Sequence, residues 1–265
     1  MTACRKCLCG SVGAVVALAL CAAHAPRAWS AGDEIQVYID DLRPRGKRGV
    51  ELHANYVPRG RRTSDYPGEQ PPGHILRVTP EFSWGLGHNW DWGLYVPFSA
   101  DKDTGTTYSD YAKLRLKYLI DEQRLDASEF YGFNVEVARS PRRTSPSAWA
   151  SELRGILGMR RGGWLLAMNA ILTTPLDRSV AENTVDLDLN FKVAKDMGGG
   201  LALGFEHYAE TGPVHRPRLR EPAGETTFAV LDYEGKGWGM NLGVGHGWTE
   251  TADRRVVKMI LGWPL

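Results

Sequence analysis

The chain has 265 residues, of which 43% are hydrophobic and 24% charged, with a formal net charge of +1. A balance this close to neutral excludes strong electrostatic attraction to nucleic acid, so we expect no nucleic-acid partner. No apolar run is long enough for a helix that spans a bilayer, which excludes a helical membrane protein.

The first thirty residues are typical of a secretory signal peptide. Arg5 and Lys6 precede an apolar run over 12–23, and Ala28-Trp29-Ser30 supplies small residues where a signal peptidase reads. A transmembrane helix would need a longer run, and lipidation at Cys21 is disfavoured by the bulky Leu20 before it. The sequence therefore predicts a signal peptide over 1–30, cleaved before Ala31.

Removal of this peptide changes both the cysteine content and the charge of the chain. It contains all four cysteines, Cys4, Cys7, Cys9 and Cys21. The exported chain then has neither disulfides nor thiol chemistry. The peptide carries three basic residues, Arg5, Lys6 and Arg27, and no acidic residue, so its removal changes the formal net charge from +1 to −2.

Residues 31–48 form a short segment with an alternating apolar part followed by a basic part. Ile35, Val37 and Ile39 alternate with Gln36, Tyr38 and Asp40, and a basic run follows over 43–48. We expect either a periplasmic extension or a plug inside the structure that follows. The basic run either contacts anionic headgroups or is a solvated linker.

From residue 49 to 265 the sequence alternates with a period of two. Between Leu76 and Leu86 the even positions are apolar and the odd positions are mostly polar, and Lys113, Arg115 and Lys117 alternate with leucines in the same way. An amphipathic helix would have a period of 3.6, so this pattern predicts β-strands with one polar and one apolar face.

Such segments recur twelve times and predict one all-β domain, an antiparallel up-and-down transmembrane β-barrel. The candidate strands are 50–57, 75–86, 90–98, 110–120, 130–139, 149–159, 164–173, 184–194, 200–209, 225–233, 237–247 and 254–263. An even strand count, with short turns alternating with long loops, is typical of barrels in the bacterial outer membrane. We therefore expect the cell outer membrane as the location, with both chain ends in the periplasm.

Aromatic residues support a membrane barrel over a soluble β-sandwich. Most of the tryptophans, among them Trp84, Trp149, Trp164, Trp248 and Trp263, fall near the ends of predicted strands. Rings at these places would lie at the two lipid–water interfaces, whereas a sandwich would more often bury them in mid-strand.

Five stretches carry a resemblance to a known family: residues 34–38 (EIQVY), 50–60 (VELHANYVPRG), 76–82 (LRVTPEF), 92–98 (WGLYVPF) and 113–118 (KLRLKY). Over residues 34–120 the chain resembles uncharacterised proteobacterial outer-membrane barrels, similar to those associated with phenol meta-pathway degradation. The resemblance implies an outer-membrane location and a transport role, without catalytic residues. The basic run 43–48 and the terminal Leu265, where an aromatic is usual, depart from the pattern.

If the polar face points inward, the lumen supplies the candidate functional residues. The expected solute path is Arg77, Glu81, Lys113, Arg115, Lys117, Glu136, Glu152, Arg154, Asp186, Asp188 and Lys192, with Asn134, Asn169, Asn190, Glu206, Asn241 and Lys258 on the same face. We predict a narrow channel or uptake pore for small solutes, anionic and aromatic ones included. The basic ladder Lys113–Arg115–Lys117 is expected roughly across the bore from Asp186 and Asp188. Alternatively, these residues pair and fill a closed interior.

Two other functions stay open. A barrel enzyme acting on lipid would need a nucleophile beside a base, and His207 with His246 is the conceivable pair, but no nucleophile, metal or phosphate motif is present. A structural or adhesive barrel would act through the loops 58–74 and 210–224. We expect no catalytic residue, cofactor or metal. The expected partners are outer-membrane lipid, a small-molecule solute and the barrel-assembly machinery, with the oligomeric state open.

Overall fold

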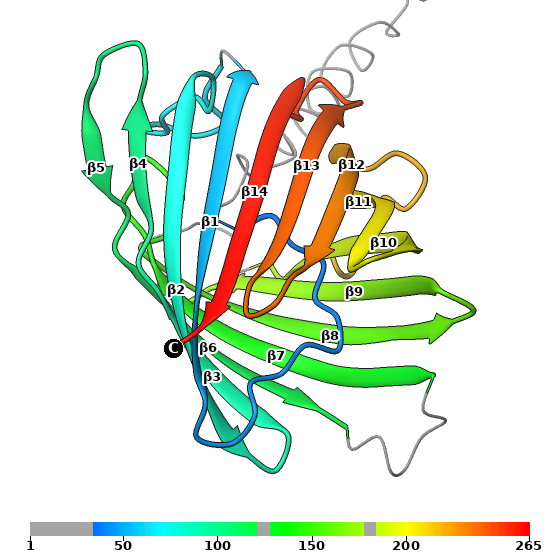
Figure 1. Ribbon diagram of the computed structural model, residues 1–265. Coiled ribbons are helices and arrows are strands. Elements are labelled where there is room, and N and C mark those ends of the chain that lie inside the picture. The colour runs from blue at the N-terminus through cyan, green and yellow to red at the C-terminus, as the bar shows by residue number, and fades with distance from the viewer. Residues whose placement is uncertain (1–33, 62, 121–127, 178–183) are drawn as a thin grey trace, which may run out of the picture.

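The computed structural model describes residues 34–61, 63–120, 128–177 and 184–265. The predicted signal peptide lies outside these residues. In the described part, fourteen strands form one antiparallel sheet that closes on itself (Figure 1). No helix among the described residues is long and apolar enough to cross a membrane.

The strands follow the predicted segments closely. They are β1 (Arg48–Arg59), β2 (Ile75–Gly87), β3 (Trp90–Tyr95), β4 (Phe98–Asp101), β5 (Thr107–Ser109), β6 (Ala112–Leu119), β7 (Glu129–Arg139), β8 (Trp149–Arg161), β9 (Trp164–Pro175), β10 (Asp186–Gly198), β11 (Leu201–Pro213), β12 (Gly224–Glu234), β13 (Gly239–Gly247) and β14 (Arg255–Pro264).

The predicted strand 90–98 divides into β3 and β4, and the short β5 lies just before the predicted strand 110–120, which contains β6. β2 pairs with β3 over one half and with β4 over the other, while β3 pairs with β6 and β4 with β5. The break between β3 and β4 falls at Pro97, which has no N–H to donate to a ladder. The break between β5 and β6 falls beside Tyr111, whose φ is 73°. Counting β3 with β4 and β5 with β6, the wall has the twelve strands that the sequence predicts.

The barrel closes because β1 pairs on both sides. Its partners are β2 and the last strand, β14, with Val50 opposite both Phe82 and Trp263. Among the described strands only the short β5 pairs on one side alone, so the wall is closed as a chain in lipid requires. The predicted all-β, twelve-stranded barrel is confirmed.

The two barrel ends differ in their connections. Two-residue turns join β8 to β9 and β10 to β11, at Gly162–Gly163 and Gly199–Gly200, and all four glycines have positive φ. Glycine allows this conformation, which the tightest hairpin turns need. Long loops lie at the other end. In outer-membrane barrels short turns are periplasmic, so we orient the barrel accordingly.

Side chains alternate between the two faces as predicted. On β6, Leu114 and Leu116 are 54% and 39% exposed on the outer face, whereas Lys113, Arg115 and Lys117 are buried in the interior. Trp149, Trp164 and Trp248 are half-exposed near strand ends. An apolar outer face with aromatic rings at both rims is the surface that a lipid bilayer covers.

Candidate functional site: the barrel lumen

The interior of the barrel holds part of its own chain. Residues 34–43, which we call the N-terminal segment, run as an extended stretch inside the wall before the chain turns into β1 (Figure 1). Ile35, Val37 and Tyr38 are buried there. After the segment, Arg45 forms a bridge with Gly85 near the periplasmic end of β2. The residues of the segment therefore lie inside the described part of the barrel (Figure 1).

Three wall side chains bind the main chain of the segment. The Asn169 side chain on β9 accepts a hydrogen bond from the Tyr38 amide (2.7 Å) and donates one to the Tyr38 carbonyl (3.0 Å). Arg154 on β8 donates to the Gln36 carbonyl at 3.1 Å, and Lys258 on β14 donates to the Ile35 carbonyl at 2.9 Å. All three wall side chains are buried.

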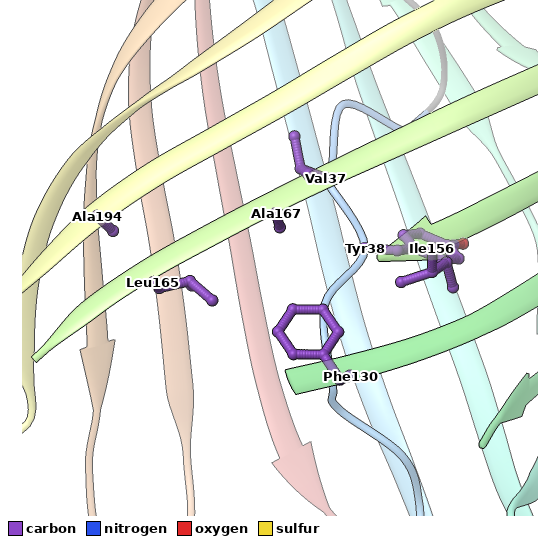
Figure 2. Close-up of a cluster of buried hydrophobic side chains, with 7 residues drawn as sticks. All are labelled: Val37, Tyr38, Phe130, Ile156, Leu165, Ala167 and Ala194. Atoms are coloured by element: carbon purple, nitrogen blue, oxygen red, sulfur yellow. The ribbon is translucent and has the colours of Figure 1, made fainter. Parts of the chain in front are cut away.

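Apolar side chains of the segment pack into two clusters on the inner wall. Figure 2 shows the first, in which Val37 and Tyr38 meet a set of side chains from β7 to β10, namely Phe130, Ile156, Leu165, Ala167 and Ala194. In the second, Ile35 packs against Val57, Phe228, Val230 and Val256. The burial of this apolar surface favours the segment inside the lumen over the segment in water.

The Tyr38 hydroxyl belongs to a buried network of hydrogen bonds. It lies 2.9 Å from the Tyr95 hydroxyl and donates to Glu136 Oε1 at 3.0 Å. The Arg154 guanidinium lies over the Tyr38 ring, 4.3 Å from its centroid. The Tyr38 hydroxyl therefore has hydrogen-bond partners in the wall, as a buried phenol requires, and its ring contacts a cation of the wall.

Charged groups fasten both ends of the segment. Glu34 pairs with Lys113 at 2.6 Å and Asp41 with Lys117 at 3.2 Å. At the periplasmic end Arg43 pairs with Glu51 at 2.8 Å and donates to Ser83. The segment is therefore held by main-chain bonds in its middle and by ion pairs on either side.

The basic ladder of β6 pairs with acids that lie close to it. Besides Glu34 and Asp41 of the segment, the ladder pairs with acids on neighbouring strands, which are Glu136 for Lys113 (3.1 Å) and both Glu81 (2.9 Å) and Asp91 (3.1 Å) for Arg115. β10 is four strands away, as expected, but Asp186 is its first residue and lies at its extracellular end. Nearby acids therefore neutralise the ladder, and its position across the bore from Asp186 and Asp188 stays a prediction.

The other predicted lumen residues also lie on the inner face. Arg77, Arg154 and Lys192 are buried, and Glu152, Asp186 and Asp188 are half-buried. Glu152 pairs with Arg154 at 2.9 Å. Glu206 pairs with Lys192 at 3.0 Å and also with Lys258. Their role as a solute path is taken up as a proposal below.

Sequence reasoning missed several inner-face residues. Glu51 and His53 share the odd parity of β1, and Asp91 and Tyr95 that of β3, so extending the alternation would have found them. The ligand atoms of Glu51, His53 and Glu81 lie within 4.8 Å of one another, in a geometry compatible with a metal ion. Each of the two carboxylates already pairs with a guanidinium, from Arg43 and Arg115.

A cavity of about 1040 Å³ lies between the N-terminal segment and the periplasmic end of the barrel. Its lining includes Asp41 and Arg43 of the segment and the turn residues Gly162, Gly163 and Gly237. Acidic and basic side chains both contribute, among them Lys192 and Asp232, which pair at 2.9 Å. The lumen therefore has a polar vestibule on one side of the segment.

The histidines considered for lipid chemistry lie on the outer wall. His207, Thr227 and His246 occupy one row across β11, β12 and β13. His207 Nδ1 is 2.9 Å from Thr227 Oγ1, and its Nε2 is 3.3 Å from Glu225. On the outer wall His207 therefore has a hydroxyl and a carboxylate as its partners.

Comparison with known proteins gives matches among solved structures alone. A scan of protein-family models gives no match, and a search of curated proteins gives none. The COG4313 outer membrane channel from Pseudomonas putida F1 matches with a TM-score of 0.55 at 11% identity, over 88% of this chain and 100% of that chain. The NanC porin matches with 0.53 at 9% identity, over 80% and 97%.

A third solved structure, a KdgM porin in complex with disordered oligogalacturonate, matches with a TM-score of 0.51 at 8% identity, over 81% of this chain and 98% of that chain. These likenesses show the fold. Together with the closed wall and its apolar outer face, they define an integral β-barrel of the outer-membrane type.

Proposed function

We propose that the protein is a narrow uptake pore for small solutes, closed at rest by its N-terminal segment. The observation that carries this proposal is a closed twelve-strand wall with a charged and polar inner face, whose bore holds, within the described part of the chain, a tethered extended stretch. A wall of this size can enclose a narrow path once that stretch moves. The solved channels and porins with this fold support the proposal.

The solute path follows the inner-face residues predicted from the sequence. On the periplasmic side it runs through the vestibule, past Glu81, Arg115 and Lys192, and beyond the segment it continues past Arg154 and Asp188. Paired charges of both signs along such a path favour small polar solutes over apolar ones. The resemblance to phenol meta-pathway proteins adds aromatic acids to the solutes worth testing.

This function rests on a division of the chain that we also propose. Residues 1–30 act as the export signal and 49–265 as the barrel that outer-membrane lipid surrounds. Within the stretch 31–48 between them, residues 34–43 plug the lumen. Insertion of the barrel would depend on the cellular barrel-assembly machinery, which accepts β-barrel substrates.

Conductance in a planar bilayer tests the proposal. The refolded full chain is compared with a variant that lacks residues 34–43, and we expect several-fold higher single-channel conductance for the variant, because the segment no longer fills the bore. Aromatic acids are then added to either side, and their effect on the current is measured. Absence of conductance from both proteins would reject the pore and leave a sealed structural barrel.

A further inference from the structure

Three of the wall groups that hold the N-terminal segment, the side chains of Asn169, Arg154 and Lys258, suit any extended peptide. The four bonds from Asn169, Arg154 and Lys258 involve only main-chain atoms of the segment. Every peptide offers the same N–H and C=O groups at the same spacing. Recognition of this kind does not depend on the sequence of the bound stretch.

Asn169 is the most specific of these contacts. A primary amide that accepts from the N–H and donates to the C=O of one residue matches the two groups of an extended peptide unit. The residue is fully buried. Its other contact is a long one, 3.5 Å from Arg154. Without a peptide in place, this buried amide would lose both of its short bonds.

Two apolar subsites flank the main-chain contacts. Ile35 packs against the cluster of Val57, Phe228, Val230 and Val256, and Val37 and Tyr38 pack against the cluster around Phe130 and Ile156. Hydrogen bonds to the main chain with pockets for side chains are the usual arrangement of peptide-binding grooves. Sugar rings, which carry hydroxyls on most edges, fit such apolar clusters poorly.

We propose that the lumen binds short extended peptides with apolar side chains, and that residues 35–38 occupy this site as an internal mimic of the solute. The inference rests on the proposed pore function, since a peptide must enter the lumen to reach Asn169. It assigns the solute class of that pore: oligopeptides that displace the segment and take over its contacts.

Peptide block of the conducting variant tests the inference. In the variant without residues 34–43, a synthetic peptide with the sequence of residues 34–41 should reduce the current at a concentration at least tenfold lower than a maltooligosaccharide of similar mass. Asn169→Leu in the same background should raise the half-blocking peptide concentration about tenfold or more, the effect of losing two hydrogen bonds.

Thr173→Val is the matched control. Thr173 lies on the same face of β9, four residues from Asn169, and makes no hydrogen bond with the N-terminal segment among the described residues. This variant should leave the peptide block unchanged. A conducting variant that peptide and oligosaccharide block equally well would overturn the peptide site while the pore stands, whereas no conductance in either chain would reject the pore itself.

A second experiment does not depend on assembly of the shortened chain. A protease site inserted after Gly46, in the exposed stretch 44–48, allows the segment to be cut from the full-length barrel after folding. The cut segment then becomes a bound peptide, whose release is followed by mass spectrometry. Release should be about tenfold faster with Asn169→Leu and unchanged with Thr173→Val. Equal release from all three proteins would contradict the proposed site.

Discussion

At the scale of single residues, the interior is organised by carboxylates shared between cations. Glu206 is buried, and its two carboxylate oxygens form ion pairs with Lys192 and Lys258. Lys258 is also fully buried. A buried cation is tolerated only with a paired anion. Two lysines of the lumen therefore share one carboxylate, and Lys192 has a second partner in Asp232.

Glu206→Gln should strongly destabilise the barrel. It removes the carboxylate partner of the buried Lys258 and one of the two partners of Lys192, and removal of one member of a buried pair costs about 3–5 kcal/mol. Urea unfolding followed by tryptophan fluorescence in detergent measures the loss. Glu234→Gln, at the exposed end of β12, should change stability by less than about 0.5 kcal/mol. Equal losses in both variants would show that the pairing is unimportant.

A second residue-scale prediction concerns the extracellular loops. Asp177 accepts hydrogen bonds from the Ser147 hydroxyl and the Ala148 amide, and the Ser147 bond above all lowers the pKa of Asp177 below its ordinary value. The contact is therefore present above the ordinary pKa and is lost as pH falls through the lowered one. Ser147→Ala should raise the Asp177 pKa, which a carboxyl NMR titration would detect. An identical titration curve would count against the hydrogen bond.

At the scale of strands, parity is what the sequence predicts best. Because successive side chains of a strand point to opposite faces, β6 could be assigned an inner and an outer face from residues 113–117 alone. The break at Pro97 and the short β5 were missed, although a proline within a run is a known signal for an interrupted ladder.

The partners of the inner residues could not be predicted. Lys113 pairs with Glu34, which is 79 residues away in the sequence. Arg115 pairs with Glu81 because the order and register of the strands place the two side chains side by side. Alternation gives the face on which a residue lies but not its height in the barrel or its neighbour. The N-terminal segment has no strand partner, so its place depends on contacts that no local pattern encodes.

Substitution on the outer face of β6 tests its orientation. Leu116→Arg should lower the free energy of unfolding by roughly 2–4 kcal/mol if the residue lies near the bilayer midplane. Leu116→Val, which keeps an apolar surface, should be tolerated. Folding yield into lipid vesicles and urea titration give the measurement. Wild-type stability of Leu116→Arg would place this face away from lipid.

Removal of the ladder charges tests the electrostatics of the path. Replacing Lys113, Arg115 and Lys117 together by glutamine, in the variant without residues 34–43, leaves Glu81, Asp91 and Glu136 uncompensated. Ion selectivity should therefore shift toward cations, more strongly at low salt, where screening is weak. The reversal potential in a salt gradient reports this shift, and an unchanged value would mean that the ladder does not face the path.

At the scale of the whole molecule, closure makes the barrel a single cooperative unit. Every described strand except the three-residue β5 pairs on both sides, so the wall offers no long free edge at which unfolding could begin. The folded protein should resist SDS at room temperature and unfold only on boiling. Gel mobility with and without heating measures this. The same mobility in both lanes, with recovery in the soluble periplasmic fraction, would contradict the membrane barrel.

The seam between β1 and β14 also affects the order of folding. It joins residues about 200 positions apart, such as Val50 and Trp263, while most other neighbours are adjacent hairpins. Contacts of such long sequence separation carry the largest loop-closure cost and form late. The N-terminal segment directly precedes β1, so it can take its place while the sheet is still open. Closing the seam then encloses it, and a chain that closed first would have to thread those residues through a finished ring.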